Sequence, residues 1–294
     1  MTVIDLIERC SARLSQAGVS FGHGTTNAFD EAAWLVLWRL GLALDALDAV
    51  AGRAVAADEL TAVDALLDQR ISTRQPAAYL TGEAWLQGVP FTVDARAIVP
   101  RSLIAEPLAD GTLDAWLKPG TRRVLDLCTG NGSLAVLAAL AWPDVVVDAA
   151  DLSQDALTVA QLNISRHALA SRISLHTGDG LAAVPGQCYD LILCNPPYVN
   201  SAAMAALPAE YRAEPSLALA GGSDGMDFIR HLLRAAPAHM APGAVLVLEI
   251  GNERGHFEHA FPTLDALWLP TSAGDDQVLL LTRDALVGLA ASAG

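Results

Sequence analysis

The sequence predicts an α/β protein in which a Rossmann-like, mostly parallel sheet ends in an antiparallel strand pair and is preceded by a small helical domain and a linking β-hairpin. Three observations support this fold class. Apolar runs of strand length alternate with helical patterns from position 123 onward. One of these runs passes through a glycine turn directly into a helical pattern. The last two runs, 264–269 and 277–282, are typical of a terminal antiparallel pair.

Helices are expected before the sheet. Thr26 or Asn27 can cap a helix whose apolar pattern runs from Ala32 to Leu42. Another helical pattern runs from Asp58 to Ile71. Pro76 ends it, because proline has no N–H to donate and clashes with the preceding turn.

A β-hairpin is expected to join two domains. The runs 83–86 and 91–93 have strand character and are separated by a turn. We therefore predict a helical substrate-recognition domain at residues 1–80, the linking hairpin at 81–95 and a catalytic domain at 96–294. The alternative role for the helical domain is that of a lid that only stabilises the protein.

The other expected elements alternate along the catalytic domain. The predicted strands are residues 123–127, 145–150, 172–176, 189–194 and 244–250, followed by the terminal pair. The predicted helices are residues 134–142, 154–169 with Ser153 as its cap, and 227–240 interrupted by Pro237. In open α/β sheets, ligands bind where the carboxyl ends of the strands meet.

The run Asn195-Pro196-Pro197-Tyr198 follows one of these predicted strands, 189–194. The two prolines fix the backbone and donate no N–H, so the carbonyls of Asn195 and Pro196 are held rigid beside an aromatic ring. Such acceptors suit a flat substrate that bears an NH2 group, either a carboxamide or an aminated base. The alternative is a strand-to-loop turn with a packed tyrosine, since turns commonly contain Asn and Pro.

A glycine loop follows the strand 123–127. Its sequence is Cys128-Thr129-Gly130-Asn131-Gly132, and it opens a helical pattern. Glycines let the backbone approach a ligand, and the first N–H groups of the helix face that ligand. A dinucleotide-binding loop would carry three glycines. Asp126 before the loop argues against a pyrophosphate and favours a ligand with a cationic or amino end.

Two further strand ends carry carboxylates. Asp151 follows the second strand of the sheet, where an acidic side chain grips a ribose diol in nucleotide-binding folds. Asp179, in the run Gly178-Asp179-Gly180, can accept a hydrogen bond from an exocyclic amine of adenine. A helix cap or a solvated loop is the alternative for either residue alone. Successive strand ends with matching chemistry favour a nucleoside-binding site.

Taken together, these motifs resemble the class I S-adenosylmethionine-dependent methyltransferases of the protein-glutamine family. Three further stretches and Cys128 are similar to the subfamily that methylates a glutamine of large-subunit ribosomal protein L-three. The stretches are Phe21–Glu31, Val99-Pro100-Arg101-Ser102 and Leu207–Pro215. The resemblance spans nearly the whole chain. The related release-factor enzymes usually have glycine at the position of Cys128.

Two positions depart from the family pattern. Residues 176–180 are a loose form of the adenine-contacting loop, and Leu103 stands where the subfamily tends to have proline. The resemblance nevertheless implies a cofactor, S-adenosylmethionine, and a set of residues that bind it. That set is Pro100, Arg101, Asp126, Cys128, Thr129, Gly130, Asn131, Gly132, Asp151, Leu152, Asp179, Gly180 and Asn195.

The resemblance also implies the catalytic residues Asn195, Pro196, Pro197 and Tyr198. The Asn195 side-chain oxygen and the Pro196 carbonyl would accept both N–H bonds of the substrate amide, while Tyr198 stacks on its flat face. Methyl transfer from a sulfonium is an in-line displacement in which positioning and electrostatics dominate. We therefore expect no metal.

Composition and charge limit the kinds of partner and the cellular locations that are expected. With 33 acidic and 18 basic residues the formal net charge is −15, which disfavours direct DNA binding and favours a basic protein substrate. A bias from genome composition or a solvated acidic surface would give the same charge. The chain shows no apolar run of membrane length and no basic-then-apolar start, so we expect a cytoplasmic protein. Its four cysteines lack metal spacing.

Three other functions remain possible from the sequence. Within the same family, the substrate could be the glutamine of a peptide-chain release factor. A DNA adenine methyltransferase uses a similar tetrapeptide on an aminated base, but it would be expected to show a basic groove and a target-recognition segment. A binding factor that only holds cofactor is the third alternative, and the intact run from Asn195 to Tyr198 counts against it.

Overall fold

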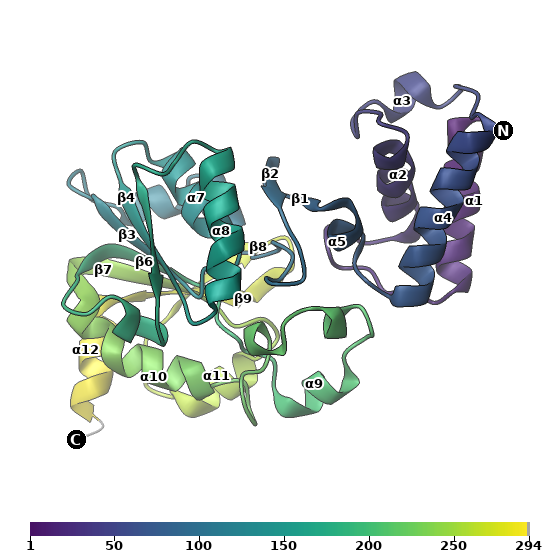
Figure 1. The fold of residues 1–294 in the computed structure, drawn as a ribbon. Helices are drawn as coiled ribbons and strands as arrows, with labels where there is room; N and C mark the ends of the chain where they lie inside the picture. The colour runs from purple at the N-terminus through teal and green to yellow at the C-terminus, as the bar shows by residue number, and fades with distance from the viewer. Residues whose placement is uncertain (293–294) are drawn as a thin grey trace.

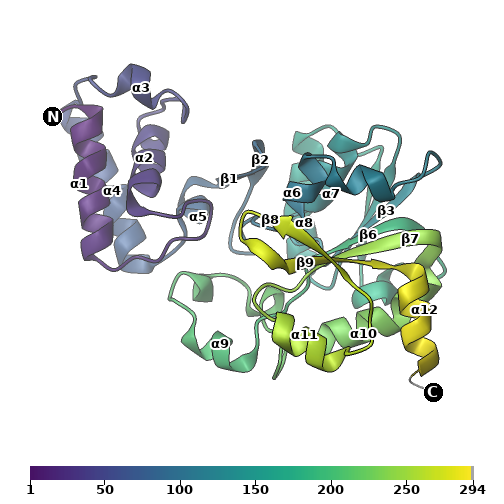
Figure 2. The ribbon, with the colours of Figure 1, turned by 180° about the vertical axis from the view of Figure 1, so that it is seen from behind.

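The computed structural model describes residues 1–292, so the last two residues of the predicted catalytic domain lie outside the described part. Helices α1–α4 stand together at one side of the molecule and the sheet stands at the other, with the short β1–β2 hairpin between them (Figures 1 and 2). The N-terminal helices are α1 (Val3–Gln16), α2 (Ala28–Arg39), α3 (Leu47–Val50), α4 (Ala57–Thr73) and α5 (Ala77–Thr81).

Local sequence explains the boundaries of the N-terminal helices. Asn27, rather than Thr26, caps α2, and its side chain accepts the N–H of Asp30. Thr2 caps α1, which the sequence analysis did not assign individually, and forms a reciprocal capping box with Asp5. Helix α4 ends at Arg74, which adopts a left-handed conformation with φ of 60° two residues before Pro76.

The predicted hairpin is confirmed, with a shorter turn than expected. Strands β1 (Glu83–Leu86) and β2 (Val89–Thr92) pair antiparallel through a two-residue turn at Gln87 and Gly88. Both turn residues have positive φ, 50° and 74°, as tight hairpin turns require. Pro90 therefore lies in β2 and not in the loop, and this two-stranded sheet accepts it because both of its strands are edges.

The main sheet has seven strands in the order β5-β4-β3-β6-β7-β9-β8. The strands are β3 (Arg123–Leu127), β4 (Val146–Asp151), β5 (Ile173–Thr177), β6 (Tyr189–Cys194), β7 (Met240–Glu249), β8 (Leu267–Thr271) and β9 (Gly274–Thr282). The first five in the order are parallel, whereas β9 runs antiparallel to both β7 and β8. This topology confirms the predicted α/β fold with a terminal antiparallel pair.

Helices cover both faces of the sheet (Figures 1 and 2). Helices α7 and α8 lie on one face, and α10 and α12 lie on the other. The α-helices of this part are α6 (Ala105–Ala109), α7 (Ser133–Ala141), α8 (Gln154–Arg166), α9 (Ser201–Ala206), α10 (Asp227–Ala235), α11 (Arg254–Ala260) and α12 (Arg283–Ser292). The short 3-10 helices are η1 (Thr112–Trp116), η2 (Gly180–Ala183), η3 (Tyr211–Ala213), η4 (Ser216–Ala218) and η5 (Ala236–His239).

Two predicted helices were too long. Helix α10 ends at Ala235, and the chain continues as η5 because Pro237 cannot donate an N–H to a further α-helical turn. Helix α8 ends at Arg166 rather than at Leu169, because Ala168 turns into the left-handed region with φ of 56°. Its predicted cap is confirmed: the Ser153 hydroxyl accepts the N–H of Ala156.

Three predicted strand starts were also displaced. Strand β9 begins at Gly274, earlier than the predicted residue 277, and Gly274 pairs with Thr271 of β8. Strand β7 begins at Met240, earlier than predicted, because Met240 pairs with the first residue of β6. Strand β8 begins at Leu267, later than predicted, because residues 261–264 form a turn in which the Leu264 N–H donates to the Phe261 carbonyl.

Candidate active site at the carboxyl edge of the sheet

Three strand ends meet at one edge of the sheet and form the base of a cleft. Leu127 at the end of β3 pairs with Ala150 of β4 and with Cys194 of β6. The residues near these strand ends, Asp151, Cys128 and Asn195, therefore lie along one edge of the sheet, with Cys128 after the central strand β3. They line a cleft of about 150 Å³. The structure thus brings together the strand-end residues that the sequence singled out.

The cleft contains most of the predicted cofactor-binding residues. Those along it are Cys128, Gly130, Asp151, Leu152, Asp179, Gly180 and Asn195. Apolar groups complete the walls, including Leu152, Ala156 and Phe228. Leu152 is exposed at this wall, so an apolar surface is available to a ligand in the cleft.

Asp126 lies beneath the glycine loop and not in the main cleft. Its Oδ2 accepts hydrogen bonds from the Thr129 hydroxyl at 2.5 Å and from the Ala135 N–H at 2.9 Å. Its Oδ1 is buried and has no protein partner within residues 1–292. Burial raises the pKa of Asp126 to about 7, although these two hydrogen bonds act in the opposite direction.

Asp126 borders a small cavity. This cavity, of about 30 Å³, is lined by Pro100, Arg101, Asn131 and Asn195 as well as by Asp126. An amino group placed there would supply the hydrogen bond that Oδ1 lacks and the positive charge that keeps the carboxylate ionised. The geometry therefore fits the cationic or amino end of a ligand.

Backbone geometry explains two residues of the loop. Cys128 has φ of 60°, a left-handed conformation that glycine adopts without strain, so a glycine at this position would be the more relaxed choice. Gly132 has φ of 80°, and a Cβ on it would lie 3.1 Å from Ala160 Cβ of helix α8. A glycine at this position lets the loop pack closely against α8.

Thr129 and Asn131 stabilise the loop itself. The Asn131 side chain accepts the N–H of Ser133 and donates to the carbonyl of Ile98, and the Thr129 N–H donates to the carbonyl of Ala150. Both side chains are buried. Neither lines the main cleft, so their predicted contact with the cofactor is confined to the small cavity.

Asp151 is fixed at the end of β4 by two backbone groups. Its Oδ2 accepts the Gly130 N–H at 2.9 Å, and its Oδ1 accepts the Ser153 N–H at 2.8 Å. Burial raises its pKa, and these bonds counteract the effect. Each carboxylate oxygen retains a free lone pair, so the residue can still accept hydrogen bonds from a diol in the cleft.

The predicted adenine loop has a tight turn. A Cβ on Gly178 would lie 2.8 Å from the Ala183 Cα, and Gly180 has φ of 53°. Asp179 faces the same cleft as Asp151. The loose sequence of this loop therefore still places a carboxylate in the cleft.

A second cavity, of about 240 Å³, adjoins the cleft at Asn195. Its walls include Pro196, Tyr198, Arg101 and Tyr211. Asn195 and Ile98 line this cavity, the main cleft and the small cavity beside Asp126, and of the two only Asn195 has a polar side chain. Within the described chain, no protein group hydrogen bonds to its side-chain amide. This amide is therefore free to bind a group that reaches it from the second cavity.

Tyr198 is held in the second cavity by Glu249, a residue that the sequence analysis missed. The Tyr198 hydroxyl donates to Glu249 Oε1 at 3.0 Å, while Oε2 accepts the Ser102 hydroxyl at 2.6 Å and the Leu103 N–H at 2.9 Å. Burial raises the pKa of Glu249. A Cβ on Gly251 would lie 2.4 Å from the Tyr198 ring, so glycine there makes room for the ring.

Arg101 contacts a second glutamate that was missed as an individual residue. Its two terminal nitrogens donate to the Glu214 carboxylate at 2.6 and 2.7 Å, and Nη1 also donates to the Val99 carbonyl. Because both terminal nitrogens of the guanidinium bind Glu214, Arg101 is held in a fixed position at the wall of the second cavity. Pro100 and Arg101 both line the small cavity, and direct binding of cofactor by either residue remains a prediction.

Membrane-spanning helices and clusters of metal-binding side chains are both absent from residues 1–292. The described helices include none that is both long and apolar enough to cross a bilayer. In the same part of the chain, no group of three or more His, Cys, Asp or Glu side chains is arranged to hold a metal ion.

The chain is similar to known methyltransferases. A family model described as Methyltransferase small domain matches residues 112–210. The chain is 53% identical over 287 residues to the ribosomal protein uL3 glutamine methyltransferase of Bordetella pertussis, covering 97% of this chain and 96% of that protein. It is 50% identical over 297 residues to the protein of the same name from Burkholderia pseudomallei, covering 98% and 97%.

A solved structure supports the fold alone. The catalytic domain of hMettl16 is 12% identical to the chain and covers 77% of it and 81% of its own length, with a TM-score of 0.50. At this identity the similarity concerns the architecture of the sheet and not the substrate.

Proposed function

Since the chain belongs to the family of ribosomal protein uL3 glutamine methyltransferases, we propose that it transfers a methyl group from S-adenosylmethionine to the side-chain amide nitrogen of a glutamine in uL3, the large-subunit protein L-three. One observation supports this function above the others. The unpartnered side-chain amide of Asn195 lies where the cleft meets the second cavity.

The residues of the cleft fit S-adenosylmethionine. The unpartnered Oδ1 of Asp126 would bind its amino group, and Asp151 would bind the ribose diol. Asp179, Leu152 and Phe228 would surround the adenine. When bound, the cofactor supplies a methyl group on a positively charged sulfur, which makes that methyl electrophilic.

Asn195 and Pro196 would orient the substrate amide. An amide nitrogen is a weak nucleophile, because its lone pair is delocalised into the carbonyl. Accepting both of its N–H bonds on the Asn195 side-chain oxygen and the Pro196 carbonyl directs the nitrogen toward the cleft and stabilises the positive charge that develops on it. Pro197 keeps this backbone rigid.

Tyr198 would stack on the flat face of the amide. Its hydroxyl is bound to Glu249, and burial keeps its pKa well above the usual range, so it stays neutral at physiological pH. The ring is thereby fixed in orientation before substrate arrives. Because Tyr198 and Glu249 are already held in place by their hydrogen bond, little conformational entropy of the Tyr198 side chain is lost when the substrate binds.

The acidic surface supports a basic protein as partner. A net charge of −15 would steer a positively charged substrate toward the enzyme. We propose that the enzyme works in the cytoplasm and that it does not bind DNA directly. Both relatives described above are named for uL3, so methylation of a release factor and methylation of DNA adenine are not favoured.

A two-substrate assay tests this function. The purified protein is incubated with methyl-labelled S-adenosylmethionine and either purified uL3 or a purified peptide-chain release factor, and the labelled residue is mapped by mass spectrometry. We expect one methylated glutamine in uL3. Label on the release factor alone would replace the proposed substrate, and label on neither protein would contradict the proposal.

A further inference from the structure

The segment Leu207–Pro215, which follows α9, supplies one wall of the second cavity. Tyr211 of this segment lines the cavity together with Asn195. The Arg101 guanidinium lies 5.4 Å from the centre of the Tyr211 ring, and the His23 ring lies 4.3 Å from it. The wall is therefore placed between Arg101 of the catalytic part and His23 of the N-terminal part.

Glu214 fixes this wall to the catalytic part. Its carboxylate accepts the bidentate bonds of Arg101 and the N–H of Val99 at 3.0 Å. His23 Nε2 lies 3.5 Å from Oε2. Burial acts to raise the pKa of Glu214, but the adjacent His23 and Arg101 outweigh it and lower the pKa to about 2.

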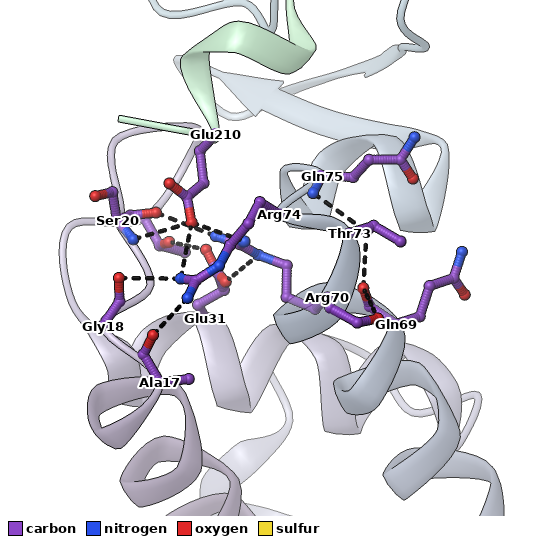
Figure 3. A network of polar contacts seen from close by, with 12 residues as sticks. Ala17, Gly18, Ser20, Glu31, Gln69, Arg70, Thr73, Arg74, Gln75 and Glu210 are labelled. Carbon is purple, nitrogen blue, oxygen red and sulfur yellow. Dashed lines mark hydrogen bonds and ion pairs between the residues drawn. The ribbon is translucent and has the colours of Figure 1, made fainter. Parts of the chain in front are cut away.

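Glu210, four residues earlier, fixes the same wall to the N-terminal helices (Figure 3). Its Oε1 accepts the Ser20 N–H at 3.2 Å, and Arg70 and Arg74 donate to it at 3.4 and 3.5 Å. Glu210 is buried. All three of these partners belong to the predicted N-terminal domain.

Arg70 makes this attachment rigid. It is fully buried, and its Nε donates to Glu31 of α2 at 2.8 Å while Nη2 donates to the Ser20 carbonyl at 3.1 Å (Figure 3). A guanidinium with these fixed partners has little freedom to follow Glu210 if the wall moves. The position of the wall therefore depends on the positions of helices α2 and α4.

Close packing adds a third contact to the two ionic ones. A Cβ on Gly22, which has φ of 125°, would lie 2.5 Å from the Tyr211 hydroxyl oxygen. The Gly22-His23-Gly24 run thus lets the N-terminal backbone reach the ring itself. Three independent contacts from residues 17–74 converge on the segment that carries Tyr211.

We propose that the N-terminal domain positions the Tyr211 wall of the substrate cavity through Glu210 and Glu214, and so contributes to kcat in addition to any recognition of the protein substrate. This inference rests on the proposed function. Glu210 touches neither cavity and acts only through the wall, so it is a positioning residue.

The test compares two substrates in the variant Glu210→Gln, which keeps the size of the side chain and removes its charge. One substrate is uL3, and the other is a short peptide that contains the target glutamine and cannot reach the N-terminal helices. We expect kcat to fall by the same factor, about tenfold or more, with both substrates, because a misplaced wall misorients the amide in either case. Glu210→Asp should recover part of the loss, and cofactor affinity should stay near the wild-type value.

Asp64→Asn is the matched control. Asp64 pairs with Arg9 and Arg13 inside the N-terminal domain and does not reach the wall. This variant also loses one acidic charge, at a partly buried position, so it reports the general effect of disturbing ion pairs in that domain. We expect wild-type kcat with both substrates.

Two outcomes would overturn the inference while the proposed function stands. One is an unchanged kcat on the peptide, and the other is a change confined to KM for uL3. If the peptide reacts too slowly to be measured, the kinetics on uL3 alone test the inference: a change in KM without a change in kcat overturns it. If Glu210→Gln fails to fold, Arg74→Met weakens the same attachment at a partly exposed position and is judged by the same criteria. A wild-type enzyme that methylates no glutamine would instead contradict the proposed function.

Discussion

Asn195 is the residue on which the proposed chemistry depends most directly. Asn195→Ala removes an acceptor that meets positive charge mainly in the transition state, so the loss should appear in kcat more than in cofactor affinity. By comparison with the removal of one preorganised electrostatic partner elsewhere, we expect a decrease of about 10²-fold or more. Steady-state kinetics on uL3 and calorimetry with S-adenosylmethionine measure the two effects.

Asn195→Asp separates the two halves of the side-chain amide. The aspartate keeps an acceptor oxygen and loses the NH2 group. A near-normal rate in the aspartate variant with an inactive alanine variant would assign the role to the acceptor. Full activity in both variants would mean that transfer occurs elsewhere, because Asn195 supplies the only polar side chain that lines all three cavities in the described chain.

Asp126 makes cofactor affinity dependent on pH. Its pKa is raised to about 7 by burial, so below that pH the cofactor-free protein holds a proton on this carboxyl. Binding an ammonium requires the carboxylate and must release that proton. Affinity should therefore rise by up to about tenfold per pH unit as pH increases toward about 7, and then level off.

Calorimetry between about pH 5.5 and about pH 8 measures this dependence, and Asp126→Asn is its control. The asparagine cannot titrate, so its variant should lack the slope. In the cofactor-free protein, the raised pKa should also lower the free energy of unfolding as pH rises from about 4 to about 7, since the unfolded chain releases the proton first. Equal slopes in both proteins would exclude Asp126 as the group responsible.

Helix α8 connects the hairpin to the glycine loop through one side chain. Asn163 is fully buried, accepts the Thr92 N–H at 2.7 Å, and donates to the carbonyls of Thr92 and Asn131 at 3.0 and 2.9 Å. Asn163→Ala removes the hydrogen bonds to one buried carbonyl, that of Asn131, and to two part-buried backbone groups of Thr92. We expect the free energy of unfolding to fall by about 3 kcal/mol, measured by chemical denaturation.

The control for this prediction is Gln161→Ala on the same helix. Gln161 is exposed and hydrogen bonds only to Ser165, so its loss should cost less than about 0.5 kcal/mol. A cost below about 1 kcal/mol for Asn163→Ala would mean that water replaces the lost partners and that the hairpin is not fixed by this residue.

Most strands and the order of the functional elements could be predicted from the sequence. Buried parallel strands read as short apolar runs, and β3 and β6 have the predicted bounds for that reason. Helix ends were less accurate where a left-handed residue, such as Ala168, ends the helix without a glycine. The tight hairpin turn was missed because Gln87 adopts positive φ, which glutamine rarely does.

Site residues could be predicted from the sequence where they stand at or directly after the end of a strand. Glu249 ends strand β7 and could have been found by the rule that singled out Asp151. Asn163 lies inside an ordinary helical pattern, and only the packed structure reveals its partners. The roles of Glu210 and Glu214 depend on contacts more than 100 positions away in the chain, which no local pattern encodes.

The two predicted domains are held together by side-chain contacts and not only by the connecting chain. Glu210 contacts the N-terminal helices, and Glu214, four residues later, contacts Arg101 of the catalytic part and His23 of the N-terminal part. Deleting residues 1 to about 75 would therefore remove the partners of Glu210 as well as any docking surface. Loss of transfer in such a truncated chain would be expected from either role, which is why single substitutions with a short peptide substrate are the more informative experiment.

Net charge is the property of the whole molecule that governs encounter with its substrate. A charge of −15 should accelerate association with a basic protein at low ionic strength, and salt should screen this attraction. We expect KM for uL3 to rise several-fold between about 50 and about 300 mM salt with little change in kcat, since encounter and not chemistry is affected. A short uncharged peptide with the same glutamine is the control and should show a constant KM. If uL3 and the peptide responded alike, the acidic surface would have no part in recognition, and its composition would need an explanation such as genome-wide bias.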